Sequence, residues 1–345
     1  MKSLNLATMV QSHVQDDRNI IEPYISVIIT AFNRKEYLIK AVRSVLDQTL
    51  SREHFEIIVT KNFVDIEIDK FLQENNVRTL LDFSNKIGMM LYNSVNETKG
   101  DVIAFLDDDD LFDPDKLHLV FENFKNDPFL VYFHNSIRTI DPLGKQINHP
   151  FNQTCNRISF AFKVNALSER KVIWNLRPDF NNSSISIKKS IFSSFISDFE
   201  TLEDVCLFAI ACESKGVMKF ETRPLTYYRV HSSTTNISSK NIDFAVRNEK
   251  LWRRNRLLLI NIKSSCSHKI CLNLLESRIL EADLHLNLLN ISTKRRKRIL
   301  SSYDAIRSFS IVRDRPFLLT VFLHMISIVM PKTAFNLFRR FKEIS

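Results

Sequence analysis

Glycine is scarce in this chain of 345 residues, which has only four, at positions 88, 100, 144 and 216. These positions cannot form the GxGxxG fingerprint of dinucleotide-binding folds, the GxxxxGK phosphate loop or the GxSxG nucleophile elbow. The HExxH pair of zinc hydrolases is absent as well. The enzyme classes that these motifs define are therefore excluded.

Cysteine is also rare, and its number is odd. The chain has five, with no CxxC pair, at positions 155, 206, 212, 266 and 271. This pattern argues against a disulfide framework and against a thiolate zinc site. The N-terminus lacks the basic-then-apolar pattern of a secretory signal. We therefore expect a reducing, cytoplasmic location.

Positive charge is concentrated at one end of the chain. From Lys240 onward there are 21 Lys and Arg against 8 Asp and Glu, a balance of +13, whereas residues 1–239 carry −4. The chain is expected to divide into a flexible lead-in (1–21), an α/β domain (22–235) and a basic helical region (236–345). Such an asymmetry suggests a polyanionic surface as a partner.

Strand and helix patterns alternate through the first 135 residues. Short apolar runs predict strands at 24–30, 55–59, 79–83, 101–106 and 129–133, and amphipathic or helix-like stretches lie between them. This alternation predicts an α/β fold with a mostly parallel central sheet.

The fourth of these strands ends on four carboxylates, Asp107 to Asp110. In open α/β sheets, ligands lie beyond the carboxyl ends of the strands. Four adjacent anionic side chains repel one another, so a hard divalent cation bound to a diphosphate would suit them. The alternative is a solvated acidic loop before the next helix, for which Asp113-Pro114-Asp115 is a good start.

Several segments together resemble the glycosyltransferase family 2 enzymes of the GT-A (nucleotide-diphospho-sugar transferase) fold. The likeness spans about residues 24–232, with Leu106 to Asp110 similar to the family's Asp-x-Asp-Asp. It is carried by Ser26 to Arg34, Phe55 to Val59, Gly88 with Asn93, and Gly100 to Asp110 followed by Pro114. The resemblance implies a nucleotide-sugar donor and Mn²⁺ or Mg²⁺ as cofactor.

The resemblance also implies individual roles at the donor site. Asp107 would approach the nucleotide and also touch the metal, Asp109 would bind the metal, and Asp110 would support them. Further donor contacts are expected from Thr30, Ala31, Phe32, Asn33, Arg34 and Asp108. Where the family has two Asp after its second strand, this chain has Thr60-Lys61-Asn62. Asn62 can replace the base-reading carboxylate or can be an ordinary turn residue, so UDP is favoured and GDP stays open.

The sequence Thr201-Leu202-Glu203-Asp204 reads in two ways. A helix that starts here, with acids in its first turn, explains it without catalysis. The resemblance instead makes Asp204 the general base that deprotonates the acceptor hydroxyl, with Glu203 positioning it or binding the acceptor. In the family the displacement is single and inverts the anomeric centre.

Two further residues come from a Tyr-Arg-x-His element at Tyr228 to His231. By resemblance, His231 would contact the metal or diphosphate and Arg229 would neutralise phosphate; a half-buried polar histidine is the alternative. The Gln-x-x-Arg-Trp element of processive polymerases is not found. We therefore expect a single-addition transferase whose acceptor is a glycan or lipid-linked glycan.

The basic region has a cluster at 294–298 and an apolar helix expected at 317–330. The polar residues of that helix fall on one stripe, and fourteen residues are too few to cross a membrane. Such a helix suits an anionic membrane surface, which would make the protein peripheral on the cytoplasmic face; packing on the catalytic body is the alternative. A nucleic-acid partner is not expected, because the acids would repel phosphates. A metal-dependent nucleotidyltransferase and a non-catalytic sugar-nucleotide-binding protein are the other functions considered.

Overall fold

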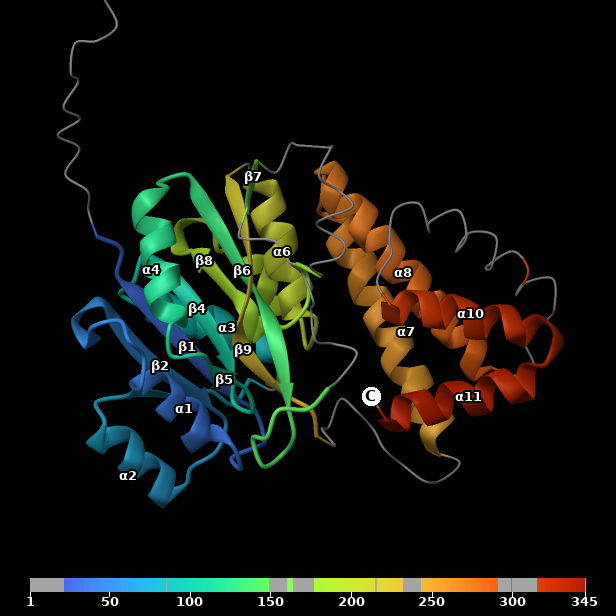
Figure 1. Ribbon diagram of the computed structural model, residues 1–345, viewed down its shortest axis with the longest axis horizontal. Coiled ribbons are helices and arrows are strands. Elements are labelled where there is room, and N and C mark those ends of the chain that lie inside the picture. Colours follow the sequence, from blue (N-terminus) through green and yellow to red (C-terminus); the bar gives the residue numbers. More distant parts are fainter. Residues whose placement is uncertain are drawn as a thin grey trace, which may run out of the picture.

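The computed structural model describes residues 22–84, 86–148, 160–163, 177–214, 216–231, 243–290, 299 and 315–344. Within them, a nine-stranded sheet carries helices on both faces, and a helical region lies beside it (Figure 1). The expected lead-in at 1–21 and the basic cluster at 294–298 lie outside the described residues.

The first half of the sheet is parallel and has the strand order β3-β2-β1-β4. These strands are β1 (Ile25–Ala31), β2 (Phe55–Lys61), β3 (Arg78–Leu81) and β4 (Val102–Asp107). They are joined by α1 (Leu38–Leu46), the 3₁₀ turn η2 (Arg52–His54), α2 (Ile66–Glu74) and α3 (Ile87–Asn96). The predicted parallel strands are confirmed here, and their carboxyl ends meet at one edge of the sheet.

The second half is mixed, because β8 runs antiparallel to both of its neighbours, β4 and β6. Its strands are β5 (Leu111–Phe112), β6 (Leu130–Ile140), β7 (Phe160–Lys163), β8 (Ile185–Lys188) and β9 (Val217–Arg229). The strand β9 pairs parallel with β6 and antiparallel with β5 and β7. Since β8 begins where β4 ends, the loop before β8 reaches the edge that carries the acids.

Two apolar layers cover the two faces of the sheet. Val27 and Ile29 of β1 pack with α1, α2 and α4 (Lys116–Asn126) on one face. Ile28 packs with α3, with α6 (Glu203–Glu213) and with the helical region on the other. Burial on both faces explains why the parallel strands read as continuous apolar runs. Three short 3₁₀ segments complete this side: η4 (Asn182–Ser184), η5 (Lys189–Ile191) and η6 (Ser194–Asp198).

The helical region is joined to the sheet domain by a shared core. It consists of α7 (Asp243–Ser264), α8 (Lys269–Leu289), α10 (Arg315–Val329) and α11 (Pro331–Ile344). Leu259 of α7 and Leu274 of α8 belong to the same apolar cluster as α6. Glu213 at the end of α6 accepts hydrogen bonds from the main-chain N–H groups of Ser267 (2.8 Å) and His268 (2.7 Å) just before α8.

The polar stripe of helix α10 is buried, whereas a helix lying at a membrane surface was expected to expose it. Thr320, His324 and Ser327 are buried, at 3, 0 and 1 % exposure, whereas Phe322 and Val329 are exposed, at 58 and 74 %. The stripe therefore faces into the helical region rather than toward water, and Thr320 lies 3.5 Å from the ring of His285 on α8. Phe322, Met325 and Val329 of α10 face outward, whereas Val321 and Leu323 are buried. None of the described helices is long and apolar enough to cross a membrane.

Candidate active site

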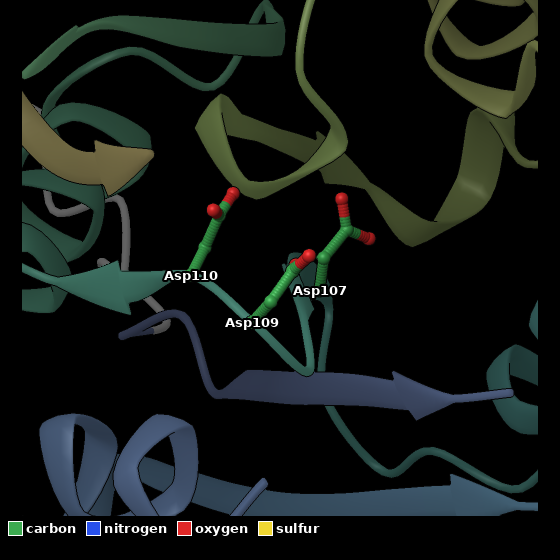
Figure 2. A group of neighbouring side chains, drawn as sticks. All are labelled: Asp107, Asp109 and Asp110. Carbon is green, nitrogen blue, oxygen red and sulfur yellow. The ribbon is translucent and has the colours of Figure 1, made fainter. Parts of the chain in front are cut away.

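Three of the four consecutive acids form a cluster at the carboxyl end of β4. Asp107 is the last residue of the strand, and Asp109 and Asp110 follow in the turn before β5. Each offers one carboxylate oxygen within 4.8 Å of the others. Figure 2 shows the three side chains extending to the same side of this turn.

The surroundings of Asp110 fit a bound cation. Its carboxylate is buried, and Oδ1 accepts a hydrogen bond from the main-chain N–H of Arg229 at 2.9 Å, whereas Oδ2 has no hydrogen-bond partner among the described residues. Burial and the nearby Asp109 raise the pKa of Asp107 to about 7 and that of Asp110 well above its usual range. A divalent ion held by oxygen ligands would satisfy the open atom and offset this repulsion.

Asp108 has a different role from its neighbours. Arg34, which follows β1, donates from Nε to Asp108 Oδ2 at 3.0 Å, and a terminal nitrogen of the same guanidinium lies 2.7 Å from Asp109 Oδ2. Arg34 and Asp108 are thus paired with each other, and their expected contacts with the donor stay a prediction. The pair holds the acidic turn against the end of β1.

His231 lies at the acids but outside the cluster of three. Its Nε2 is 2.8 Å from Asp109 Oδ2 and 3.3 Å from a terminal nitrogen of Arg34. Its expected role as a metal ligand stays a prediction, whereas Asp110, expected only to support, is a full member of the cluster.

Arg229 is hydrogen-bonded to the acidic turn after β4. Its guanidinium donates to the main-chain carbonyls of Asp109 (2.7 Å), Asp141 (3.0 Å) and Pro142 (3.0 Å), and lies over the ring of Tyr37 at 4.5 Å. These bonds hold Arg229 against the turn, but its Nη2 is buried without a hydrogen-bond partner among the described residues, and its expected contact with phosphate stays a prediction.

The loop at 177–184 connects the acids to α6, which sequence reasoning did not predict. Asn182 donates from Nδ2 to Asp107 Oδ1 at 3.2 Å, and the Asp107 N–H donates to the hydroxyl of Ser183 at 3.0 Å. The main-chain N–H of Asn181 donates to Asp204 Oδ2 at 3.0 Å. Asn181 has φ +70°, in the left-handed region that asparagine tolerates better than most residues. One loop thus touches both the acidic cluster and the expected base.

Glu203 and Asp204 occupy different environments at the start of α6. Glu203 has a buried Oε2 without a hydrogen-bond partner among the described residues, and burial followed by the charge of Asp204 raises its pKa to about 8. Asp204 accepts hydrogen bonds from the N–H groups of Val205 (2.8 Å) and Asn181, and burial followed by Asp179 raises its pKa to about 6. At neutral pH, therefore, Glu203 is mainly protonated and Asp204 mainly ionised.

The helix α6 starts at Glu203, with Glu203 and Asp204 in its first turn. Leu202 rather than Thr201 is the N-cap, with φ +66° and no side-chain hydrogen bond. A bulky residue in the left-handed region is strained, and such strain concentrates at functional sites.

A cavity of about 540 Å³ brings these groups together. Of the residues predicted from the sequence, those that line it are Thr30, Phe32, Asn33, Arg34, Asp107, Asp108, Asp109, Glu203, Arg229 and His231. Asp110 and Asp204 are not among the residues that line it. The side chain of Ala31 is completely buried in the apolar core that includes α1 and α2, and its expected contact with the donor stays a prediction. Sequence reasoning missed Glu36, Ile87, Glu200, Thr201, Tyr228 and Arg254.

Asn62 directly follows β2, and Asn33 follows the neighbouring parallel strand β1. Its Oδ1 accepts from the Asn33 N–H at 2.8 Å, and its Nδ2 donates to Asn33 Oδ1 at 2.9 Å. Asn62 does not line the cavity itself; it fixes Asn33, which has φ +56° and does line it.

A buried lysine near the acids was also missed. Lys116, at the start of α4, is completely buried and donates to the main-chain carbonyl of Ser183 and to the hydroxyl of Thr226 (3.1 Å). Burial lowers the pKa of Lys116 well below its usual range, and Asp110 opposes this shift. A lysine at a helix start normally signals a solvent-exposed residue, so the sequence carried no clear sign of it.

Curated relatives match about 60 % of the chain. A chondroitin synthase of Escherichia coli is 24 % identical over 225 residues, which are 60 % of this chain and 32 % of that protein. A glycosyltransferase of Rickettsia bellii without assigned function is 28 % identical over 224 residues, 63 % of this chain and 30 % of that protein. This chain spans about a third of the length of these relatives.

Solved structures match over nearly the whole chain. TarS of S. aureus, residues 1–349, in complex with UDP-GlcNAc, has a TM-score of 0.57 and 14 % identity, covering 92 % of each chain. Without that ligand the TM-score is 0.56 and the identity 11 %. Such a likeness shows the fold, which is of the GT-A type with a helical C-terminal region. Residues 26–176 match the model of glycosyl transferase family 2, and this stretch holds the parallel strands and the acidic turn.

Proposed function

We propose that this protein is a metal-dependent, inverting glycosyltransferase that transfers a sugar from a nucleotide diphosphate donor to a hydroxyl group of a glycan or lipid-linked glycan. The observation that carries this is the acidic cluster with its open Asp110 oxygen: Asp107 and Asp109 line the same cavity as Glu203, and the loop at 177–184 contacts both Asp107 and Asp204. UDP is the favoured nucleotide, supported by the UDP-GlcNAc bound to TarS.

Asp107, Asp109 and Asp110 are the proposed ligands of Mn²⁺ or Mg²⁺. Bound there with the diphosphate, the ion would act as a Lewis acid that offsets the negative charge of the leaving group. Arg34 and His231 hold the Asp109 carboxylate in place from the side. The Asn33–Asn62 pair and Phe32 shape the end of the cavity proposed for the nucleoside.

Asp204 is the proposed general base. Its pKa of about 6 leaves it ionised at neutral pH yet basic enough to accept a proton from the acceptor hydroxyl. Each carboxylate oxygen has two acceptor sites, so one hydrogen bond from the main chain to each still leaves a site for the hydroxyl. Protonated Glu203 on the cavity wall is the proposed hydrogen-bond donor to a sugar hydroxyl.

The outward face of α10 is proposed to lie on an anionic membrane surface, on the cytoplasmic side. Phe322, Met325 and Val329 recur at helical spacing and are exposed, whereas the polar residues of the helix are buried. Lys332, directly after this face, is exposed as well. An apolar stripe bordered by positive charge fits a helix lying in the lipid interface.

A thermal-shift panel tests the donor site. UDP-sugars, GDP-sugars and the free nucleotides are added with Mn²⁺, with Mg²⁺ and without metal, because a ligand that binds only the folded protein raises its melting temperature. We expect a metal-dependent rise with UDP-sugars. A panel without any metal-dependent rise would contradict the proposal, and binding without turnover would identify a non-catalytic sugar-nucleotide-binding protein.

A further inference from the structure

The helical region supplies one residue to the wall of the candidate active site. Arg254 of α7 lines the cavity together with Glu200, Thr201 and Glu203, which lie before and at the start of α6. Its guanidinium is 3.4 Å from Glu200 Oε2. Glu200 precedes Glu203 by only three residues, so Arg254 belongs to the part of the cavity near the proposed base.

The other arginines that line the cavity are already bound. Arg34 is paired with Asp108 and Asp109, and Arg229 is held by three main-chain carbonyls. Arg254, by contrast, makes one long contact, and the side chains of Arg254 and Glu200 are 43 and 51 % exposed. Exposed ion pairs of this kind contribute little and exchange readily.

The adjacent arginines of α7 have partners on the helical region itself. Arg253 donates to Glu249 at 2.9 and 2.6 Å, and Arg256 donates to Asp283 at 2.7 Å. Among the described residues of α7, only Arg254 is turned toward the cavity. A planar guanidinium at such a place is suited to a carboxylate or a phosphate, which it can bind with two parallel hydrogen bonds.

We propose that Arg254 binds an anionic group, a carboxylate or a phosphate, carried by the acceptor. This inference rests on the proposed function, because only the acceptor has to reach the base at this end of the cavity. The diphosphate of the donor belongs to the acidic cluster at Asp107 and Asp109. When no acceptor is bound, Arg254 forms an ion pair with Glu200, and the incoming anion displaces Glu200 from it.

The test uses the full chain saturated with UDP and Mn²⁺ and measures binding of small probes by calorimetry. The probes are methyl β-glucuronoside, its neutral counterpart methyl β-glucoside, and glycerol phosphate; the first and third distinguish a carboxylate from a phosphate. We expect at least one anionic probe to bind about tenfold more tightly than the glucoside, as a hydrogen bond to a charged group provides.

Variants separate recognition from a structural effect. Arg254→Gln should remove the preference for the anionic probe, whereas Arg253→Gln, the adjacent matched control, should keep it. Glu200→Gln should strengthen anion binding because it removes the internal competitor, and a purely structural role of this pair would not produce opposite signs. Equal binding of charged and neutral probes, no binding of either anion, or an unchanged preference in Arg254→Gln overturns the proposal. Absence of UDP binding overturns the proposed function as well.

Discussion

Arg278 of α8 donates two hydrogen bonds to the carboxylate of Asp179, from Nε at 2.7 Å and from a terminal nitrogen at 3.1 Å. Both side chains are almost completely buried, at 10 and 2 % exposure. Asp179 belongs to the loop that reaches Asp107 and Asp204, so this ion pair connects the helical region to the candidate active site.

Replacing Arg278 with Gln should destabilise the protein strongly. The change leaves the Asp179 carboxylate buried without its counter-charge, and breaking a buried pair in this way costs about 3 to 5 kcal/mol. Urea unfolding measures the loss. Arg253→Gln is the control, because it breaks an exposed pair with Glu249 worth at most about 1 kcal/mol. An equal loss of unfolding free energy in the two variants would show that the Arg278–Asp179 pair stabilises the protein no more than an exposed pair does.

Asp109→Asn should abolish transfer and the metal-dependent part of donor binding. Asparagine keeps the size of the side chain but removes a charged oxygen ligand, and the cluster has only three of them. Binding of UDP with and without Mn²⁺ provides the measurement. Asp115→Asn is the matched control, since Asp115 lies shortly after the same strand and is exposed. Wild-type metal dependence in Asp109→Asn would remove the metal assignment.

The pH dependence of kcat/KM should be bell-shaped, with limits near 6 and 8. Asp204 has to be ionised to accept a proton, so the rate should rise as pH increases through about 6. Glu203 has to be protonated to donate a hydrogen bond, so the rate should fall above about 8. In Glu203→Gln the decline above pH 8 should disappear while the lower limit remains. A decline that persists in this variant would exclude Glu203 as its source.

The parallel strands and the acidic turn could be predicted because their signals are local. The strands β1, β2 and β4 are buried on both faces and appear as unbroken apolar runs, and Asp107 to Asp110 follow one of them directly. The partners that fix these acids could not be predicted. Asn182 and Arg229 reach Asp107 and Asp110 from segments far along the chain, and their positions depend on how β8 pairs with β4 and β9 with β6.

The orientation of α10 shows a second limit. A polar stripe on an apolar helix predicts an amphipathic element, but periodicity alone does not say which face is covered. Here α8 and α11 cover the side with Thr320 and His324, so the polar residues are inside. Tertiary packing determines which face of the helix is buried, and the sequence pattern of residues 317–330 alone does not predict it.

Phe322→Ser should weaken binding to anionic liposomes by about tenfold, because it removes a large exposed apolar side chain from the proposed interface. Sedimentation with vesicles of phosphatidylserine and phosphatidylcholine measures the effect, and raised salt should reduce binding further by screening the basic residues. Leu143→Ser is the control, since Leu143 is also exposed, at 88 %, but belongs to the sheet domain. A wild-type protein that does not sediment at low salt would refute the membrane surface.

Asp204→Asn separates catalysis from donor binding more sharply than any other change. Asparagine keeps the size of the side chain and its oxygen acceptor for the Asn181 N–H, but it cannot take a proton at the pH of the reaction. Transfer should therefore fall by about 10² to 10⁴, while the affinity for UDP-sugar and Mn²⁺ stays near that of the wild type. If the acids only begin a helix, the variant instead loses about 0.3 to 1 kcal/mol of stability and keeps its turnover. Melting temperature, donor affinity and single-turnover rate measured on one sample decide between these outcomes, and near-normal turnover would remove Asp204 as the base while leaving the donor site intact.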